Sequence, residues 1–149
     1  MTNVRAVKEP GKPGHLAADS LGPSPGALRY PEHRVDIKAA PGTWRARLGD
    51  TELARSDHAW CVSESGYPDV IYFPRESVHL DRLNSSQSET TCPFKGRAGY
   101  YAAQVGGQLR DIAWFYPRTY REVEQLADHI AFYTHSVTIE RENDHEPGC

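Results

Sequence analysis

The sequence predicts a mainly β protein of the α+β type, with antiparallel sheets and one helix packed on them. Three observations carry this prediction. Short segments of apolar and β-branched residues recur roughly every 8–12 residues, with turn residues between them. Two dipeptides typical of tight hairpins, Gly49-Asp50 and Gly106-Gly107, join consecutive segments. One segment near the C-terminal end has the apolar period of a helix.

Most of the predicted strands alternate apolar with polar residues, which is typical of a sheet that buries one face. Val35 and Ile37, for example, alternate with Asp36 and Lys38. The segment "DVIYF" is instead continuously apolar until Pro74, which predicts a strand covered on both faces. In chain order the predicted strands are "RVDIKAA", "TWRARLGD", "TELARS", "AWCVSE", "DVIYF", "SVHLDRL", "GYYAAQV", "QLRDIAWFY" and "SVTIER".

The predicted helix spans Tyr120–Ile130, about 11 residues. Thr119 is placed as its N-cap, and Glu122 would complete a capping box. We expect the helix to be structural, because its apolar stripe is plain aliphatic and its other residues are polar. The stripe consists of Val123, Leu126, Ala127 and Ile130.

The chain divides into three segments by composition. Residues 34–141 form the predicted domain. Residues 1–33 contain five prolines and form an arm that should neither propagate a helix nor enter a central strand. Whether this arm is mobile or lies over the domain stays open. Residues 142–149 form a polar tail.

Charge and hydropathy exclude several classes of function. The net charge is −3, so the chain has no basic field to hold a nucleic-acid backbone. No apolar run approaches the roughly 20 residues of a membrane helix, and the first 20 residues show no apolar signal-peptide region. The oligomeric state is left open, with a homodimer as one alternative.

The cysteines suggest a reduced compartment. Cys61, Cys92 and Cys149 are odd in number and far apart, and no C-x-x-C occurs. This pattern excludes a four-cysteine zinc site and argues against a disulfide framework. The sequence therefore predicts a cytoplasmic protein.

The stretch "TTCPFKGRAGYY" concentrates reactive residues in a predicted turn. Cys92 is a candidate nucleophile, since Lys95 could supply the cation that activates a thiolate, although a small buried thiol is the favoured alternative. Lys95 is one of two lysines in the domain, with Lys38, and Phe94 precedes it. It is a candidate base or anion contact, and the alternative is a solvated turn lysine.

Aromatic side chains predict a small-molecule pocket, because ring walls with a few polar tips are typical of such sites. Most of the rings should nevertheless be core. Tyr100 and Tyr101 are adjacent in a strand, so at most one of them can face a given pocket. The predicted ligand-binding residues are Tyr72, Arg75, Cys92, Lys95, Tyr101, Trp114 and Tyr116.

No metal or cofactor site is predicted. The carboxylates Glu64, Asp69, Glu76 and Asp81 are scattered without a supporting spacing, and the histidines show neither H-x-H nor H-x-x-x-H. His129 is placed on the predicted helix, off the apolar stripe, where a solvated side chain is expected. No glycine-rich phosphate loop occurs.

The order of the motifs resembles the bacterial domain of unknown function 427 family. The resemblance rests on "YFP" at 72–74, "CPFKGRAGY" at 92–100, "WFYP" at 114–117 and "AFY" at 131–133, and it covers roughly residues 34–141. It implies a β-tent, in which two antiparallel sheets meet along one side and lean apart. The fold is similar to the ligand-binding domain of cereblon-type proteins, where aromatic side chains cage a planar cyclic ligand. The cysteines that hold zinc there have no counterparts in this chain.

The family is also labelled nucleotidyltransferase-like. We discount that activity, because no Gly-Ser followed by spaced aspartates is present to hold magnesium and a triphosphate. Three functions remain: binding of a small planar or anionic molecule in an aromatic cleft, a small-molecule enzyme using Cys92 or Lys95 in the same cleft, and a protein-interaction module. The sequence does not decide whether the chain is an enzyme.

Overall fold

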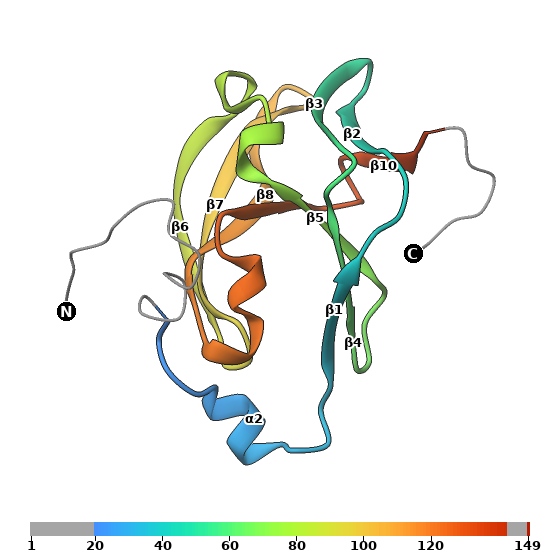
Figure 1. Ribbon diagram of the computed structural model, residues 1–149. Helices are drawn as coiled ribbons and strands as arrows, with labels where there is room; N and C mark the ends of the chain where they lie inside the picture. Colours follow the sequence, from blue (N-terminus) through green and yellow to red (C-terminus); the bar gives the residue numbers. More distant parts are fainter. Residues whose placement is uncertain (1–19, 143–148) are drawn as a thin grey trace.

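The computed structural model describes residues 20–142 and residue 149. These residues form one seven-stranded and one three-stranded sheet, both antiparallel, which confirms the mainly β fold (Figure 1). The strand orders are β1-β4-β5-β9-β8-β7-β6 and β10-β2-β3. The strands are β1 (Val35–Ala39), β2 (Trp44–Leu48), β3 (Thr51–Ser56), β4 (Trp60–Glu64), β5 (Val70–Pro74), β6 (Asn84–Cys92), β7 (Gly96–Val105), β8 (Gln108–Thr119), β9 (His129–Phe132) and β10 (Thr138–Arg141).

The seven-stranded sheet buries side chains on both of its faces. On β5, Ile71 and Phe73 belong to a hydrophobic cluster shared with the three-stranded sheet, whereas Tyr72 belongs to a second cluster on the other face. β5 is therefore continuously apolar because both of its faces are buried, as the sequence predicted. β4 alternates in the same way, since Cys61 joins the first cluster and Val62 the second.

Both predicted hairpins are confirmed. Gly49-Asp50 joins β2 to β3, and Gly106-Gly107 joins β7 to β8. Both glycines of the second turn have positive φ angles, 59° and 83°, which favour glycine. One strand, β6, was not predicted. It is polar and lies at an edge of its sheet, so it lacks the apolar alternation by which the others were found.

Another predicted strand is wrong. "SVHLDRL" forms parts of two 3₁₀ turns, η1 (Arg75–Ser77) and η2 (Leu80–Arg82), with Val78 making only an isolated bridge to Ala54 of β3. Its alternating pattern was real, and Val78 is buried. The backbone turns there because Val78 and Leu83 donate to the carbonyls three residues earlier.

The predicted helix Tyr120–Ile130 is also wrong. Its first part is a 3₁₀ helix, η3 (Arg121–Leu126), interrupted by non-helical angles at Val123, and its last part belongs to β9. Asp128 separates the two with a φ of +62°. The residues of the apolar stripe are buried, as predicted. A spacing of three residues also suits a 3₁₀ turn. Pairing with β5 and β8 makes the last part of the segment a strand. The predicted solvated His129 is a half-buried strand residue whose Nδ1 lies 2.8 Å from the Ala127 carbonyl.

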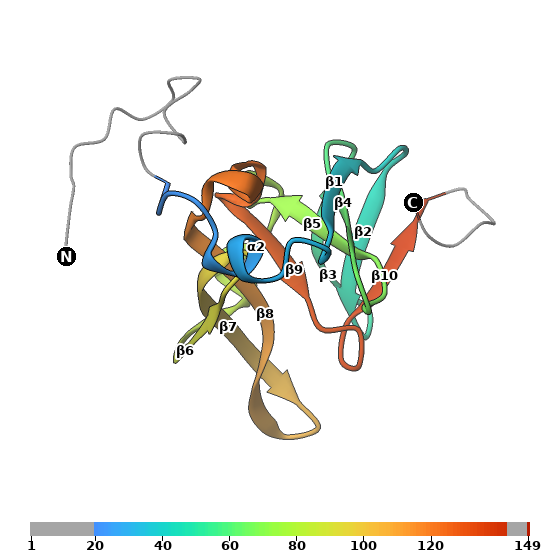
Figure 2. The same ribbon diagram turned by 90° about the horizontal axis from the view of Figure 1, so that it is seen from below.

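The N-terminal segment contains a short helix, α2 (Pro25–Arg29), contrary to the predicted arm without helix. Pro25 occupies the first turn, where its missing N–H is harmless, and Ser24 caps the helix by accepting from the Ala27 N–H. In Figure 1 α2 lies at the bottom, between the lower ends of β7 and β1, and Figure 2 shows it from below. Residues 20–33 therefore pack on the domain, while residues 1–19 of the predicted arm lie outside the described residues.

The cysteine prediction needs correction as well. The structure joins Cys61 of β4 to Cys149 in a disulfide, across a sequence separation of 88 residues. Sequence spacing gave no sign of the pair, because the fold alone brings these two positions together. Of the predicted tail, only Glu142 and Cys149 are described, and residues 143–148 lie outside. In the described part of the chain, no helix has the length and apolar character needed to span a membrane.

Candidate functional site

The candidate site is built around the turn from β6 to β7. Cys92 ends β6 and Gly96 begins β7, and between them the Lys95 N–H donates to the Cys92 carbonyl at 3.3 Å. Gly96 has a φ of +138°, and a Cβ there would lie 2.6 Å from the Arg118 carbonyl oxygen. Only glycine lets β7 pass β8 so closely at this position. This turn directs the Lys95 side chain into the interior, where Lys95 is only 6% exposed.

Lys95 is paired in this interior. Its Nζ donates to Glu64 Oε1 on β4, and the other carboxylate oxygen lies 2.9 Å from His33 Nε2. The His33 ring stacks on Phe94 with 3.9 Å between ring centroids. Residues from the N-terminal segment, from β4 and from the turn thus form one chain of polar contacts, in which the lysine charge faces a carboxylate.

Lys95 and Glu64 line a cavity of about 270 Å³ with aromatic walls. Its volume is near the lower end of the range for small-molecule sites, roughly 300–1,000 Å³. β4, β5, β7 and β8 supply walls from the face of the second hydrophobic cluster. The lining residues are Val62, Glu64, Tyr67, Pro68, Val70, Tyr72, Lys95, Tyr100, Trp114, Tyr116 and Tyr133.

The aromatic walls are held by hydrogen bonds between their polar tips. Trp114 Nε1 donates to the Tyr72 hydroxyl oxygen at 3.0 Å, and the two rings are edge to face. The Tyr100 hydroxyl hydrogen-bonds Thr90 Oγ1 at 2.7 Å, and the Tyr133 ring packs on Trp114 with 4.6 Å between ring centroids. This network fixes the rings before any molecule enters, which lowers the entropic cost of binding.

Burial keeps these phenols neutral. It raises the pKa of Tyr72 and of Tyr116 far above the ordinary value of a tyrosine, because a buried phenolate loses its hydration. It also raises the pKa of Tyr133, to about 12, with a further contribution from the neighbouring Tyr100 hydroxyl. At neutral pH the site therefore offers hydroxyl donors and no phenolate charge.

The structure places the seven predicted ligand-binding residues in different surroundings. Four of them line this cavity: Tyr72, Lys95, Trp114 and Tyr116. Cys92 packs against the second hydrophobic cluster as a free thiol, outside the lining. Tyr101 stacks on Phe115 at 4.8 Å between centroids, on the opposite face of the sheet. Arg75 is exposed at η1, where its N–H donates to the Asp128 carbonyl.

Sequence reasoning missed Glu64, Tyr133 and His33. Glu64 carried a usable signal, since it follows Val62 by two residues in a predicted strand and must share its face. Its pairing with Lys95 was out of reach, because that depends on which strands face each other across the cavity. Tyr100, rather than Tyr101, is the member of the tyrosine pair that faces the cavity.

A second cavity of about 310 Å³ adjoins the first. Trp114 and Tyr133 form part of the wall of both, together with Pro68 and Val70. Asp69 and Cys149 also line this second cavity.

The two antiparallel sheets, with a small aromatic cavity on one face of the larger sheet, define a mainly β protein with a candidate small-molecule site. The chain belongs to the family described as domain of unknown function (DUF427), whose model matches residues 36–143. The resemblance inferred from the sequence motifs is thereby confirmed. No curated protein matches the chain.

Proposed function

We propose that this protein binds a small, neutral, planar molecule in the aromatic cavity. The observation that carries the proposal is the combination of fixed ring walls with an internally paired lysine. Flat rings offer stacking surface to a planar molecule. The tyrosine hydroxyls and the Lys95 ammonium supply donors on the cavity wall.

The pairing of Lys95 favours a neutral molecule over an anion. Its charge is balanced by Glu64, so an anionic group entering the cavity would meet the carboxylate as well as the ammonium. The Tyr72 oxygen accepts from Trp114, and its own proton is available for donation to a carbonyl group. A planar ring that carries a carbonyl acceptor is the chemistry that this arrangement suits.

Three measurements test the proposal on the full chain. Native mass spectrometry of protein taken directly from purification should show a bound small molecule. A thermal-shift screen of neutral heteroaromatic lactams against aromatic carboxylates of matched size should favour the neutral set, and Trp114 fluorescence should change on binding. Equal or better binding of the carboxylates would contradict the neutral assignment.

A variant links the binding to this cavity. Tyr67 lines the cavity but is 66% exposed, so Tyr67→Ala should leave the fold intact. Loss of one stacking wall should weaken binding by about 1 kcal/mol, roughly fivefold. Tyr30→Ala is the matched control, because Tyr30 is also an exposed tyrosine, at 53%, and lies outside the cavity lining. Equal effects of the two substitutions would place binding elsewhere.

The enzyme alternative is retained through Lys95 alone. Of the two catalytic candidates, Lys95 lines the cavity whereas Cys92 does not. The pairing of Lys95 with Glu64 suits a hydrogen-bond donor better than a base, which is why binding is preferred here.

The cytoplasm is kept as the proposed compartment. Thiol trapping in intact cells tests it, since a protein of that compartment should carry Cys61 and Cys149 in reduced form.

A further inference from the structure

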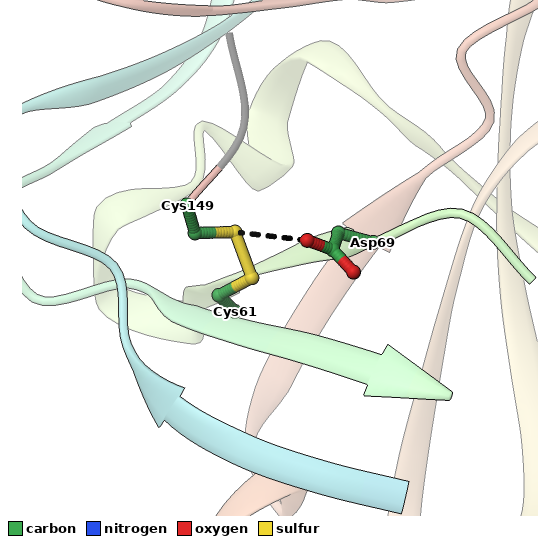
Figure 3. A group of neighbouring side chains, drawn as sticks. All are labelled: Cys61, Asp69 and Cys149. Carbon is green, nitrogen blue, oxygen red and sulfur yellow. Dashed lines mark hydrogen bonds between the residues drawn. A yellow bond between two sulfur atoms is a disulfide. The ribbon is translucent and has the colours of Figure 1, made fainter. Parts of the chain in front are cut away.

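A second group of reactive side chains lies apart from the Lys95–Glu64 pair, and two of its members, Asp69 and Cys149, line the second cavity. Figure 3 shows Cys61, Asp69 and Cys149, whose ligand atoms all lie within 4.8 Å of one another. Cys61 is fully buried on β4, Cys149 is half-buried, and Asp69 is exposed at the start of β5. Two cysteine sulfurs and a carboxylate are thus gathered from positions far apart in the chain.

One carboxylate oxygen of Asp69 faces a disulfide sulfur. Ser63 Oγ donates to Asp69 Oδ1 at 2.9 Å, which leaves Oδ2 facing Cys149 Sγ at 4.0 Å. The sulfurs of a disulfide carry no proton, so this approach is not a hydrogen bond while Cys61 and Cys149 are joined. The Asp69 Oδ2 atom gains a protonated sulfur partner only when the disulfide is reduced.

We propose that the reduced pair Cys61 and Cys149, together with Asp69, binds a soft divalent cation such as Zn²⁺. Thiolate sulfur and carboxylate oxygen are both zinc ligands, and three protein ligands leave a fourth position for water. The Ser63 hydroxyl would orient the carboxylate, as a hydrogen-bonding neighbour commonly does for a metal ligand. Asp69 and the partly exposed Cys149 give the ion a path from solvent.

The chemistry has two balanced steps. A dithiol or phosphine reductant supplies two electrons that break the sulfur–sulfur bond, and two protons convert both sulfurs to thiols. Zn²⁺ then displaces these two protons and forms two zinc–sulfur bonds. The disulfide and the metal site therefore exclude each other, and the redox state decides which is present.

The test uses the full chain and Co²⁺ as a spectroscopic probe that Zn²⁺ displaces. After reduction with a phosphine and its removal, Co²⁺ should bind at about one equivalent per chain with thiolate-to-metal absorption, and Zn²⁺ should abolish that signal. The oxidised protein should show no thiolate-to-metal absorption. Circular dichroism before and after reduction verifies that the fold persists.

Variants separate this site from other thiol chemistry. Cys149→Ser should remove the thiolate absorption pattern, and Asp69→Asn should weaken binding at least about tenfold. Cys92→Ser is the matched control and should bind like the parent, since Cys92 lies outside the cluster. The proposal is overturned if the folded reduced chain binds no Co²⁺, if Cys149→Ser binds equally well, or if reduction unfolds the protein. The last result would make the disulfide purely structural.

Discussion

At the scale of single residues, the contact between Lys95 and Glu64 has the largest consequences. Both side chains are nearly buried, at 8% and 14% exposed. Charges removed from water are stabilised only by each other, so such a pair contributes little net stability while either partner left alone is strongly destabilising. Pairing with Glu64 fixes the position of the Lys95 ammonium group in the site.

Lys95→Met is therefore expected to lower the free energy of unfolding by about 3 kcal/mol, because Glu64 would keep only His33 as a partner. Urea unfolding measures this change. The double variant Lys95→Met/Glu64→Gln should recover part of the loss, since it removes the buried charge as well. Lys38→Met, the exposed lysine of the domain, is the control and should stay within about 0.5 kcal/mol of the parent. A double variant as unstable as the single one would show that the ion pair is not the cause.

At the scale of elements, α2 fastens the N-terminal segment to the turn that carries Lys95. Ser24 Oγ and the Gly26 N–H both donate to the Pro93 carbonyl, at 2.8 and 2.9 Å. The Ser24 N–H donates to Glu122 Oε1 of η3 at 2.9 Å. Glu122, predicted to cap its own helix, instead binds the preceding segment.

Gly26→Ala tests this attachment. Alanine is favoured over glycine in a helix by about 1 kcal/mol. Here its Cβ would lie 2.7 Å from the Phe94 ring and 2.8 Å from the Pro93 carbonyl oxygen. Overpacking of this kind costs about 1–3 kcal/mol, so we expect net destabilisation, seen as a lower thermal midpoint. Leu28→Ala, at a side chain 76% exposed in the same helix, should change little. A stabilised Gly26→Ala protein would mean that α2 does not pack as described.

Leu126→Ala tests the packing of η3. Leu126 is fully buried in the second hydrophobic cluster, and removing its methyl groups should cost about 2–5 kcal/mol in chemical unfolding. The exposed neighbour Gln125 supplies the control, Gln125→Ala, for which a near-zero change is expected. Similar values for the two positions would contradict the burial of this face.

The elements also show what could be predicted from the sequence. Strands with apolar alternation or a continuous apolar run were found because burial sets those patterns directly, and glycine pairs marked the hairpins. β6 was missed because a polar edge strand has no such pattern. Tyr120–Ile130 was misassigned because a stripe of spacing three and four does not distinguish an α-helix from a 3₁₀ turn followed by a strand. For the site, Lys95 and Trp114 stood out by composition, whereas Glu64 and His33 reach it only through the topology.

At the scale of the whole molecule, the buried phenols link stability to alkaline pH. An unfolded tyrosine ionises near pH 10.0, whereas burial raises the pKa of Tyr72, Tyr116 and Tyr133 in the folded state. Below that pH both states hold the phenolic protons and stability is unaffected by them. Above it the unfolded state releases them first, so stability falls as pH rises.

We expect urea unfolding to show this fall from about pH 10 upward, by about 1.4 kcal/mol per pH unit for each buried phenol. Tyrosinate absorbance should lag behind that of exposed tyrosines and appear with unfolding. Tyr116→Phe removes one ionising group and should make the slope shallower, whereas Tyr67→Phe, at an exposed ring, should not. Equal slopes in all three proteins would contradict the burial of these phenols.

Residues 20–33 pack on the domain, although they precede the segment that the family model matches. The family match starts at residue 36, yet Leu21 and Gly22 exchange backbone hydrogen bonds with Thr119 and Arg121. His33, also before the match, holds the carboxylate of the cavity. The segment that the family model matches is therefore smaller than the packed unit of the structure. A chain trimmed to the shared segment would lose the contacts that Ser24 and Gly26 make with Pro93 in the turn that carries Lys95, so the properties of such a fragment would say little about the intact protein.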